Sequence, residues 1–301
     1  MKLFVKTILL LLLPAFVGAQ QSQHKQMDSL RLALNSAANH TIRMVIYRDI
    51  GQSYQEVNRD SALLYNIRAL TLSKKFNFKL NAAQYLADLG YVQTLMEKYP
   101  EALKSFFQAL NIAGDPAIEK YPYYFTYYQE KTVSFIKSSI ISDTYHKMGH
   151  LYGYTGNTDK QILSYRETER IAVSIKDTAM LALVNMNLTW ANTVIGKFDS
   201  ALVFGNKSLA YYSGLSNLEG KRYYEVEALR NVGDIYRKTG NIELAKQTLF
   251  KAIRVGEEQN NLSPLGYAYY SIADLYYGEN KTDSSLFYAK KGLAVINEVK
   301  D

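Results

Sequence analysis

One spacing of small and large residues recurs along the chain, and it restricts the possible folds more than any other feature. Gly233 is followed twelve residues later by Ala245, and Gly90 is followed at the same distance by Ala102. Large residues such as Val232 precede each glycine and repeat every three or four positions, which is the period of one helix face. A small residue on each of two helices lets the helices approach closely. The pattern therefore predicts a pair of packed helices joined by a turn.

Six copies of this pattern follow one another through most of the chain, at intervals of roughly 40 residues. Their first small positions are Gly51, Gly90, Gly149, Thr189, Gly233 and Ala273. The expected copies cover residues 44–74, 83–113, 142–175, 182–215, 226–258 and 266–298. The third copy departs from the pattern at Gln161 and Thr168, and the fourth departs at Asn185, Thr189 and Asn192. Because one helix pair cannot bury its apolar face alone, the copies predict an all-α fold of stacked pairs.

The large and small positions of these copies resemble the tetratricopeptide repeat (TPR) family, whose unit is a helix–turn–helix pair. The resemblance implies a right-handed, TPR-like helical solenoid of about six repeats over residues 41–301. Aspartate before an apolar run predicts the start of a helix, because its side chain caps the first free N–H groups. Asp60, Asp199 and Asp283 stand at such starts of second helices, and Asp28 predicts a leading helix within residues 20–40.

The interval from Gly90 to Gly149 is 59 residues, which exceeds the other intervals by roughly one short helix. The excess lies near residues 115–140. Six aromatic residues gather there, namely Tyr121, Tyr123, Tyr124, Phe125, Tyr127 and Tyr128. One interpretation is a lengthened helix or a helical insert whose rings pack on neighbouring repeats. The other is an aromatic lip over a binding groove. Both follow from the tendency of aromatic rings to become buried.

The first residues have the order of a secretion signal. Lys2 and Lys6 give a positive start, Thr7–Phe16 is apolar, and Val17-Gly18-Ala19 supplies small residues before a polar segment. This order predicts a signal peptide over residues 1–19 that is cleaved after Ala19. The alternative, an uncleaved anchor, is disfavoured because the apolar stretch has about half of the roughly 20 residues that a spanning helix needs. We therefore expect an exported protein, periplasmic or secreted, with no membrane span after cleavage.

The residue types present disfavour most enzyme classes. The chain has no cysteine, which excludes disulfides, thiolate nucleophiles, cysteine-ligated metals and lipid attachment to a cysteine. We find no glycine-rich phosphate loop and no Gly-x-Ser-x-Gly elbow, so we expect neither catalysis nor a cofactor. The net charge of +7 includes two leader lysines and no long basic run, so no nucleic-acid partner is predicted.

The TPR resemblance implies which residues line a binding groove on the first helices. Carried onto this chain, those positions are Arg48, Gln52, Tyr91, His146, His150, Trp190, Arg230, Asp234, Arg237, Tyr270, Asp274 and Tyr277. Aromatic residues and arginine often anchor interfaces, although the same positions also suit plain solvent-facing residues. The Lys and Asn pair with which the family clamps a peptide carboxylate is absent from every copy, so a ligand of that kind is not expected.

His146 and His150 stand four residues apart and therefore share one helix face. Two histidines at this spacing can hold Zn²⁺, but a catalytic site would need a third ligand and a base, and no Glu lies between them. A pH-sensitive contact is the better interpretation, since neutral histidine gains charge near pH 6.5.

Two functions remain. The first is an exported interaction scaffold that binds a peptide, a protein segment or a small ligand in a groove. The second comes from a resemblance of the leader and of the Asp-Ser-Ala-Leu helix starts to periplasmic input regions of two-component histidine kinases and regulators in Bacteroidetes-type bacteria. The chain stops at Asp301 without a membrane helix or a signalling domain. It would then be a stand-alone or truncated sensor region. The sequence leaves the oligomeric state open.

Overall fold

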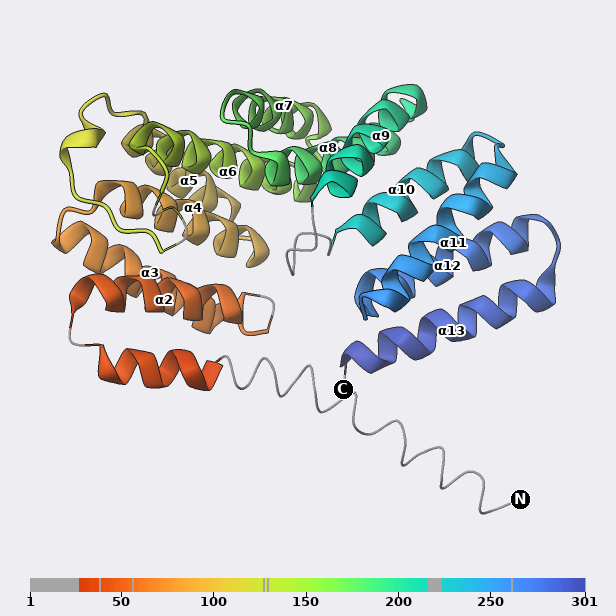
Figure 1. Ribbon diagram of the computed structural model, residues 1–301, viewed down its shortest axis with the longest axis horizontal. Coiled ribbons are helices and arrows are strands. Elements are labelled where there is room, and N and C mark those ends of the chain that lie inside the picture. The colour runs from red at the N-terminus through yellow and green to blue at the C-terminus, as the bar shows by residue number, and fades with distance from the viewer. Residues whose placement is uncertain are drawn as a thin grey trace, which may run out of the picture. The chain divides into compact units, whose positions relative to one another are not determined.

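The computed structural model describes residues 27–37, 39–55, 57–126, 128, 130–215, 224–260 and 262–300. Within these ranges the secondary structure is helical, with no strand (Figure 1). This confirms the all-α prediction. The expected signal peptide, residues 1–19, lies outside the described residues. The expected leading helix is present over residues 27–36. No helix of the described ranges has both the length and the apolar character needed to cross a membrane.

The helices follow one another in six pairs, each with a first helix and a second helix. The first helices are α2 (His40–Tyr54), α4 (Lys79–Leu95), α6 (Val133–Tyr154), α8 (Thr178–Val194), α10 (Glu225–Lys238) and α12 (Leu262–Gly278). The second helices are α3 (Arg59–Lys75), α5 (Tyr99–Gly114), α7 (Thr158–Ser174), α9 (Phe198–Gly214), α11 (Ile242–Glu258) and α13 (Thr282–Lys300). A short 3₁₀ helix, η1 (Ile118–Lys120), follows α5.

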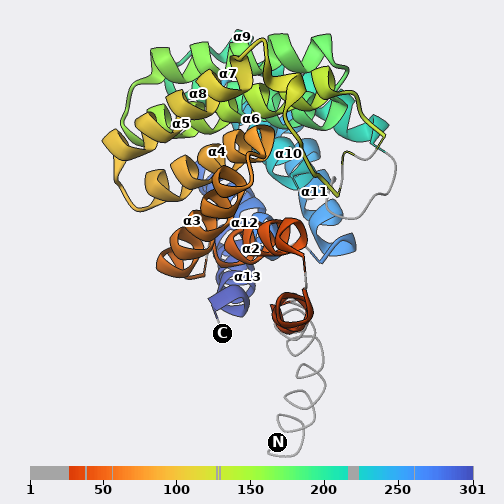
Figure 2. The same cartoon turned by 90° about the vertical axis from the view of Figure 1, so that its left-hand side faces the viewer.

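The helices form two compact units, divided between Leu151 and Tyr152. In unit 1, α2 packs on α3, α3 on α4, and α4 on α5 (Figure 1, Figure 2). In unit 2, consecutive helices from α8 to α13 pack on one another, and α10 also contacts the first helices α8 and α12. Within each unit, neighbouring pairs thus pack on one another, which is the TPR-like arrangement that the repeats predicted.

The small positions are sites of close helix contact. A Cβ atom placed on Gly90 would lie 2.7 Å from the ring of Phe106, and one on Gly233 would lie 2.7 Å from Leu249 Cγ. In both pairs the glycine is on the first helix and the large residue is on the second. Since packed carbon atoms sit about 3.5–4.0 Å apart, there is no room for a methyl group at either glycine.

Two of the departures in the third and fourth copies face a glycine on the partner helix. In the fourth copy Thr189 takes the position of the glycine, and Gly205 takes the position of the large residue on the second helix. In the third copy the buried side chain of Gln161 occupies a usual alanine position, and Gly153 makes room for it, since a Cβ atom there would lie 2.5 Å from Gln161 Nε2.

We expect Gly153→Ala to lower the free energy of unfolding by about 1 kcal/mol, because the new methyl group displaces the amide of Gln161 in a packed interface. The double variant Gly153→Ala/Gln161→Ala should recover about half of that loss, which thermal unfolding followed by circular dichroism would measure. Gly278→Ala is the control, because a Cβ atom at Gly278 meets nothing within 4 Å. If both variants lose the same free energy of unfolding, Gly153 does not serve to make room for Gln161.

The insert near residues 115–140 is only partly helical. Residues 121–126, 128 and 130–132 are not in a helix, and α6 begins at Val133. The prediction of a helical insert is therefore wrong for this stretch, although α6 is lengthened at its start. The extended stretch is held by Asn81, which is fully buried; its Nδ2 donates to the Tyr124 carbonyl at 2.7 Å, and its Oδ1 accepts from the Tyr124 N–H at 3.0 Å. Phe125 packs into the core of unit 1.

Candidate functional site

The first helices of unit 2 lie side by side, with α10 between α8 and α12. Their sequences differ sharply in charge. Helix α8 has no charged residue, α12 has only Asp274, and α10 has six charged residues. A helix that simply faces water is expected to carry charged or polar side chains on its exposed face. The near absence of charge on α8 and α12 is therefore unusual for helices with an exposed face.

Three of the five exposed residues of helix α12 are tyrosines. Its exposed residues are Tyr267, Tyr270, Asp274, Tyr277 and Gly278. Tyr277, with 70% of its surface accessible, is the most exposed of the three tyrosines. The first four follow at intervals of three or four residues and so form one stripe along the helix. We call Tyr267, Tyr270, Asp274 and Tyr277 the tyrosine stripe.

Helix α8 exposes a second apolar group. Trp190, the one tryptophan of the chain, is 47% exposed, and Val194 lies one turn further on and is also exposed. Trp190 is at the same repeat position as Asp234 of α10 and Asp274 of α12. Equivalent positions of stacked repeats share one face. The tyrosine stripe, the charged residues of α10, and Trp190 with Val194 together are called the first-helix surface of unit 2.

A ladder of ion pairs runs along α10 and ends on α12. Arg230 lies 3.9 Å from Glu227 and 3.3 Å from Asp234. Arg237 lies 3.8 Å from Asp234 and 3.0 Å from Asp274. Across the same two helices, the hydroxyl of Ser271 on α12 donates to Asp234 Oδ2 at 3.0 Å. These contacts fix α10 and α12 relative to each other.

Burial affects the acids of this ladder. It raises the pKa of Asp234, and the neighbouring Arg230, Ser271 and Arg237 only partly offset the effect. It also raises the pKa of Glu227, against the charge of Arg230. The Nε atom of Arg237 is buried without a hydrogen-bond partner among the described residues. The ladder is thus a row of partly buried charged side chains on α10, between the exposed rings of α8 and α12.

The predicted residues of unit 1 lie in a different environment. Asp88, which is 1% exposed, accepts from Arg48 Nε at 2.8 Å and from Lys147 Nζ at 2.5 Å. Lys147 also donates to Asp143 at 2.6 Å. Arg48 is therefore engaged in a buried cluster that joins α2, α4 and α6. Gln52 is half-buried, and its Nε2 has no hydrogen-bond partner within the described ranges.

His146, His150 and Tyr91 form a ring cluster in unit 1. The ring centres of His146 and His150 are 4.7 Å apart, and those of Tyr91 and His150 are 5.8 Å apart. Burial lowers the pKa of His150 to about 4, helped by the charge of Lys147. Burial also holds the pKa of His146 well below its ordinary value, with further lowering by His150 and Lys147. The expected gain of charge near pH 6.5 is therefore wrong for both histidines.

The described residues bring no third His, Cys, Asp or Glu into a metal-binding group with the two histidines. His146 is only 7% exposed. The ring cluster is thus a packed element of unit 1, and its histidines contribute through shape and ring contacts.

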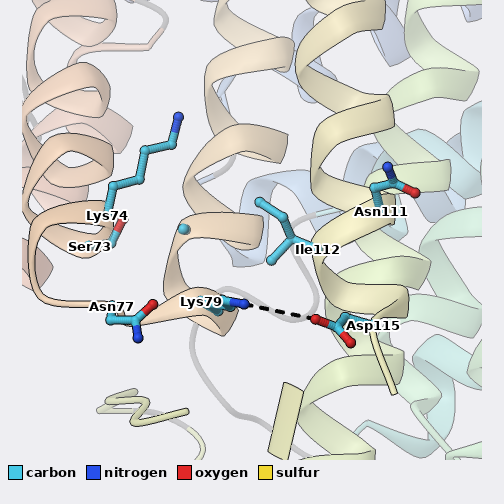
Figure 3. Close-up of a pocket in the computed structure, with 8 residues that line it drawn as sticks. Ser73, Lys74, Asn77, Lys79, Asn111, Ile112 and Asp115 are labelled. Carbon is cyan, nitrogen blue, oxygen red and sulfur yellow. Dashed lines mark ion pairs between the residues drawn. The ribbon is translucent and has the colours of Figure 1, made fainter. Parts of the chain in front are cut away.

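A cavity of about 340 Å³ opens in unit 1 between the ends of α3, α4 and α5 (Figure 3). It is lined by Ser73, Lys74, Asn77, Lys79, Ala82, Asn111, Ile112 and Asp115. Lys79 Nζ lies 3.9 Å from Asp115 Oδ2 and 3.6 Å from the centre of the Tyr121 ring. Because Lys79 is held by these two groups, the lining offers a ligand little beyond Lys74 and two amides.

The structure thus separates the predicted groove residues into two sets. In unit 2, α10 and α12 bring Arg230, Asp234, Arg237, Tyr270, Asp274 and Tyr277 together on adjacent helices, with Trp190 on α8. In unit 1, Arg48, Tyr91, His146 and His150 belong to packed clusters. Tyr267 on α12 and Val194 on α8 are exposed members of the first-helix surface that the repeat positions did not select. The first-helix surface of unit 2 is therefore the candidate binding site.

Sequence comparison identifies one repeat directly. Residues 226–255 match the family described as Tetratricopeptide repeat, and this segment begins where the fifth copy was expected to begin. No match was found among the curated proteins.

Several solved structures have a similar fold. A Rap protein complexed with Competence and Sporulation Factor is 13% identical, with a TM-score of 0.66, and the match covers 95% of this chain and 73% of that one. BtubC (BKLC) from P. vanneervenii is 12% identical, with a TM-score of 0.64 and coverages of 81% and 93%.

A third similar structure belongs to a larger protein. PH0952 from Pyrococcus horikoshii, a Signal Transduction ATPase with Numerous Domains that carries a tetratricopeptide repeat sensor, is 19% identical. Its TM-score is 0.63, and the match covers 92% of this chain and 40% of that one. At these identities the likeness concerns the fold, and it confirms the tetratricopeptide type.

Proposed function

Because this chain is a helical repeat protein of the tetratricopeptide type, we propose that it is an interaction scaffold that binds a peptide or a protein segment on the first-helix surface of unit 2. The observation that supports this most strongly is the tyrosine stripe. A solvated helix face would carry lysine and glutamate, and α12 carries three exposed tyrosines instead. Tyrosine and tryptophan are enriched at the centres of interfaces, where they bury much surface for little lost conformational freedom.

The second helix α7 can be compared with the first helices α8 and α12 in the residues that it carries. Helix α7, a second helix of the same unit, has charged residues at Asp159, Lys160, Arg166, Glu167, Glu169 and Arg170. Several of these form ion pairs with each other, such as Arg170 with Glu167. Helix α7 also exposes Leu163 and Val173 but no aromatic ring, whereas α8 exposes Trp190 and α12 exposes three tyrosines. This difference favours α8 and α12 as the helices that meet a partner.

The clusters of unit 1 support a different role for its predicted residues. Arg48 is held by Asp88, and His150 contacts both His146 and Tyr91. A partner would have to break these contacts to use the side chains. We therefore assign the main contacts of the partner to unit 2, and a structural role to these four residues of unit 1.

One comparison is consistent with this function. A similar structure is that of a Rap protein complexed with Competence and Sporulation Factor. The proposal for this chain depends on its own exposed rings and not on that likeness.

The test is affinity capture with the purified chain from an extract of its own organism, comparing wild type with Trp190→Ala/Tyr277→Ala. We expect at least a tenfold loss of the captured partner in the double variant, because buried aromatic anchors each contribute about 2 kcal/mol or more. Phe107→Ala is the control, since Phe107 is 56% exposed on the second helix α5. Equal capture by wild type and the double variant would exclude the first-helix surface.

Export is a further part of the proposal. It is supported by the charged start, the short apolar stretch and the small residues before Gln20. Expression in a bacterial host, followed by fractionation and N-terminal sequencing, tests it. The expected mature protein begins at Gln20 and is recovered from the periplasm or the medium; recovery of the uncleaved chain from the cytoplasm would contradict it.

A sensor input region is the second candidate function. The sequence resemblance to periplasmic sensor regions favours it, and the tetratricopeptide repeat sensor of PH0952 is a similar fold in a signalling protein. The two functions differ in the identity of the partner. Capture of a membrane-anchored kinase, or a neighbouring gene for one, would favour the sensor role; capture of unrelated exported proteins would favour the general scaffold.

A further inference from the structure

We infer that the partner places a lysine or arginine side chain on Asp274, between Tyr270 and Tyr277. This inference rests on the proposed function and adds the chemistry of the partner to it. It depends on three features of the first-helix surface of unit 2, which are its balance of charge, its pattern of exposure and the arrangement of its rings.

The balance of charge leaves one negative group in excess. Across α8, α10 and α12 there are four carboxylates and three cations; the carboxylates are those of Glu225, Glu227, Asp234 and Asp274, and the cations are Arg230, Arg237 and Lys238. The charged residues of α10 balance one another, and α8 and α12 have no cationic residue of their own to balance Asp274. A partner that carries a positive charge here therefore meets net attraction, whereas an acidic segment would meet net repulsion.

The pattern of exposure locates the excess at Asp274. Its side chain is 56% exposed, whereas no other member of the ladder exceeds 38%. Arg237 Nη2 lies 3.0 Å from its Oδ2 atom. A carboxylate has about four lone-pair directions and can accept a second cationic donor. A cationic side chain of the partner can therefore reach the carboxylate of Asp274 more easily than the other carboxylates of the ladder, without displacing Arg237.

The rings make the same place suitable for a cation. Tyr270 and Tyr277 lie four residues before and three residues after Asp274, so both share its helix face. Aromatic faces attract lysine and arginine within about 6 Å of the ring centre. In this chain such contacts are already present, for example between Arg166 and the Phe204 ring at 4.2 Å. A carboxylate between two rings therefore favours a cationic side chain with apolar neighbours.

The experiment uses peptides selected from a random heptapeptide phage library on the purified full chain. The selected peptides are resynthesised, and each lysine or arginine is replaced by norleucine or citrulline, which are neutral and of similar size. We expect the neutral peptides to bind the wild-type chain at least tenfold more weakly. The cationic peptides should lose a similar factor on Asp274→Asn. The neutral peptides should bind wild type and Asp274→Asn equally, because the two changes remove the same contact.

The control for charge is Glu258→Gln, which removes one exposed carboxylate from the second helix α11. It should leave the affinity of the cationic peptides unchanged. Circular dichroism of each variant checks the fold. A rise of salt from 50 to 500 mM should weaken the cationic peptides more than the neutral ones, since exposed charges are screened.

The outcomes separate the two claims. One outcome is that Trp190→Ala/Tyr277→Ala abolishes peptide binding, while neither the neutral replacement in the peptide nor Asp274→Asn changes the affinity. That outcome would overturn the inference and leave the proposed function standing. Binding that is indifferent to every substitution on the first-helix surface would overturn the proposed function itself. Loss of binding in Asp274→Asn alone, with no difference between cationic and neutral peptides, would also overturn the inference.

Discussion

Replacing Asp88 by asparagine is expected to lower the free energy of unfolding by about 3 kcal/mol, because it leaves two cations without their buried counter-charge. Asp88 is 1% exposed and takes bonds from both Arg48 and Lys147. The three residues lie on α2, α4 and α6, so the loss weakens three successive first helices together. Urea unfolding of wild type and variant measures the difference.

The control for Asp88 is Asp143→Asn. Asp143 pairs with the same lysine, but its side chain is 28% exposed, so we expect a loss of no more than about 1 kcal/mol. The triple variant Arg48→Met/Asp88→Leu/Lys147→Met tests the cause. If uncompensated charge is responsible, the triple variant should be more stable than Asp88→Asn, since apolar replacement of a whole buried cluster is often neutral. A triple variant less stable than Asp88→Asn would contradict this account.

The stability due to Asp88 also depends on pH. Burial raises the pKa of its carboxyl, but the charges of Lys147 and Arg48 and their hydrogen bonds outweigh burial and lower it. A carboxyl whose pKa is lower in the folded state stabilises that state above its unfolded pKa of about 3.9. The contribution falls as the pH drops through the lower, folded pKa. The difference between wild type and Asp88→Asn should therefore be constant at neutral pH and should shrink below about pH 4.

Replacing Gly90 by alanine is expected to lower the free energy of unfolding by about 2 kcal/mol, even though alanine is the better helix former. The new Cβ atom would lie 2.7 Å from Phe106 Cε1 and 3.1 Å from the backbone oxygen of Ala102. The Phe106 ring is fully buried and the carbonyl belongs to a helix, so neither can move freely. Thermal and urea unfolding provide the measurement.

A double-variant cycle identifies the ring as the cause. Gly90→Ala/Phe106→Leu should lose less stability than the sum of the two single variants, because leucine vacates part of the space that the methyl group needs. Gly114→Ala is the matched control, since a Cβ atom there meets nothing within 4 Å. Additive losses in the cycle would show that Phe106 does not limit the space at Gly90.

The sequence was sufficient to predict the fold because the signal is local and repeated. The interval between a first-helix glycine and a second-helix alanine, together with the period of large residues, fixed the helix pairs. Aspartates such as Asp60 correctly marked the starts of the second helices, but their predicted capping role was wrong. Asp60 lies in the first turn of α3, and the side chain of Asn58 caps this helix by accepting from the Ser61 N–H. The non-helical stretch before Val133 was missed because its tyrosines fit a helix face equally well, and the anchor at Asn81 lies 43 residues from Tyr124.

The candidate site was harder to predict, because position in a repeat does not reveal exposure. The repeat positions identified Trp190, Tyr270, Asp274 and Tyr277, which the structure places at the surface. The same rule selected His146, which is buried by its neighbours. Asp88 and Lys147, the centre of the cluster in unit 1, are 59 residues apart and were not found. Only the packing of three first helices brings them together.

The exchange of small residues between partner helices has a consequence for how such chains are detected. A Cβ atom on Gly205 would lie 2.5 Å from Val232 Cγ2 and 3.4 Å from Thr189 Cγ2, and Gly153 stands beside Gln161, so space is preserved although these positions do not hold their usual residues. A family model that scores each repeat position independently gives a low score to both residues of such an exchanged pair. The family match falls on one copy without such an exchange, residues 226–255. Scoring paired positions by their joint volume would recover the degenerate repeats of this and other solenoids.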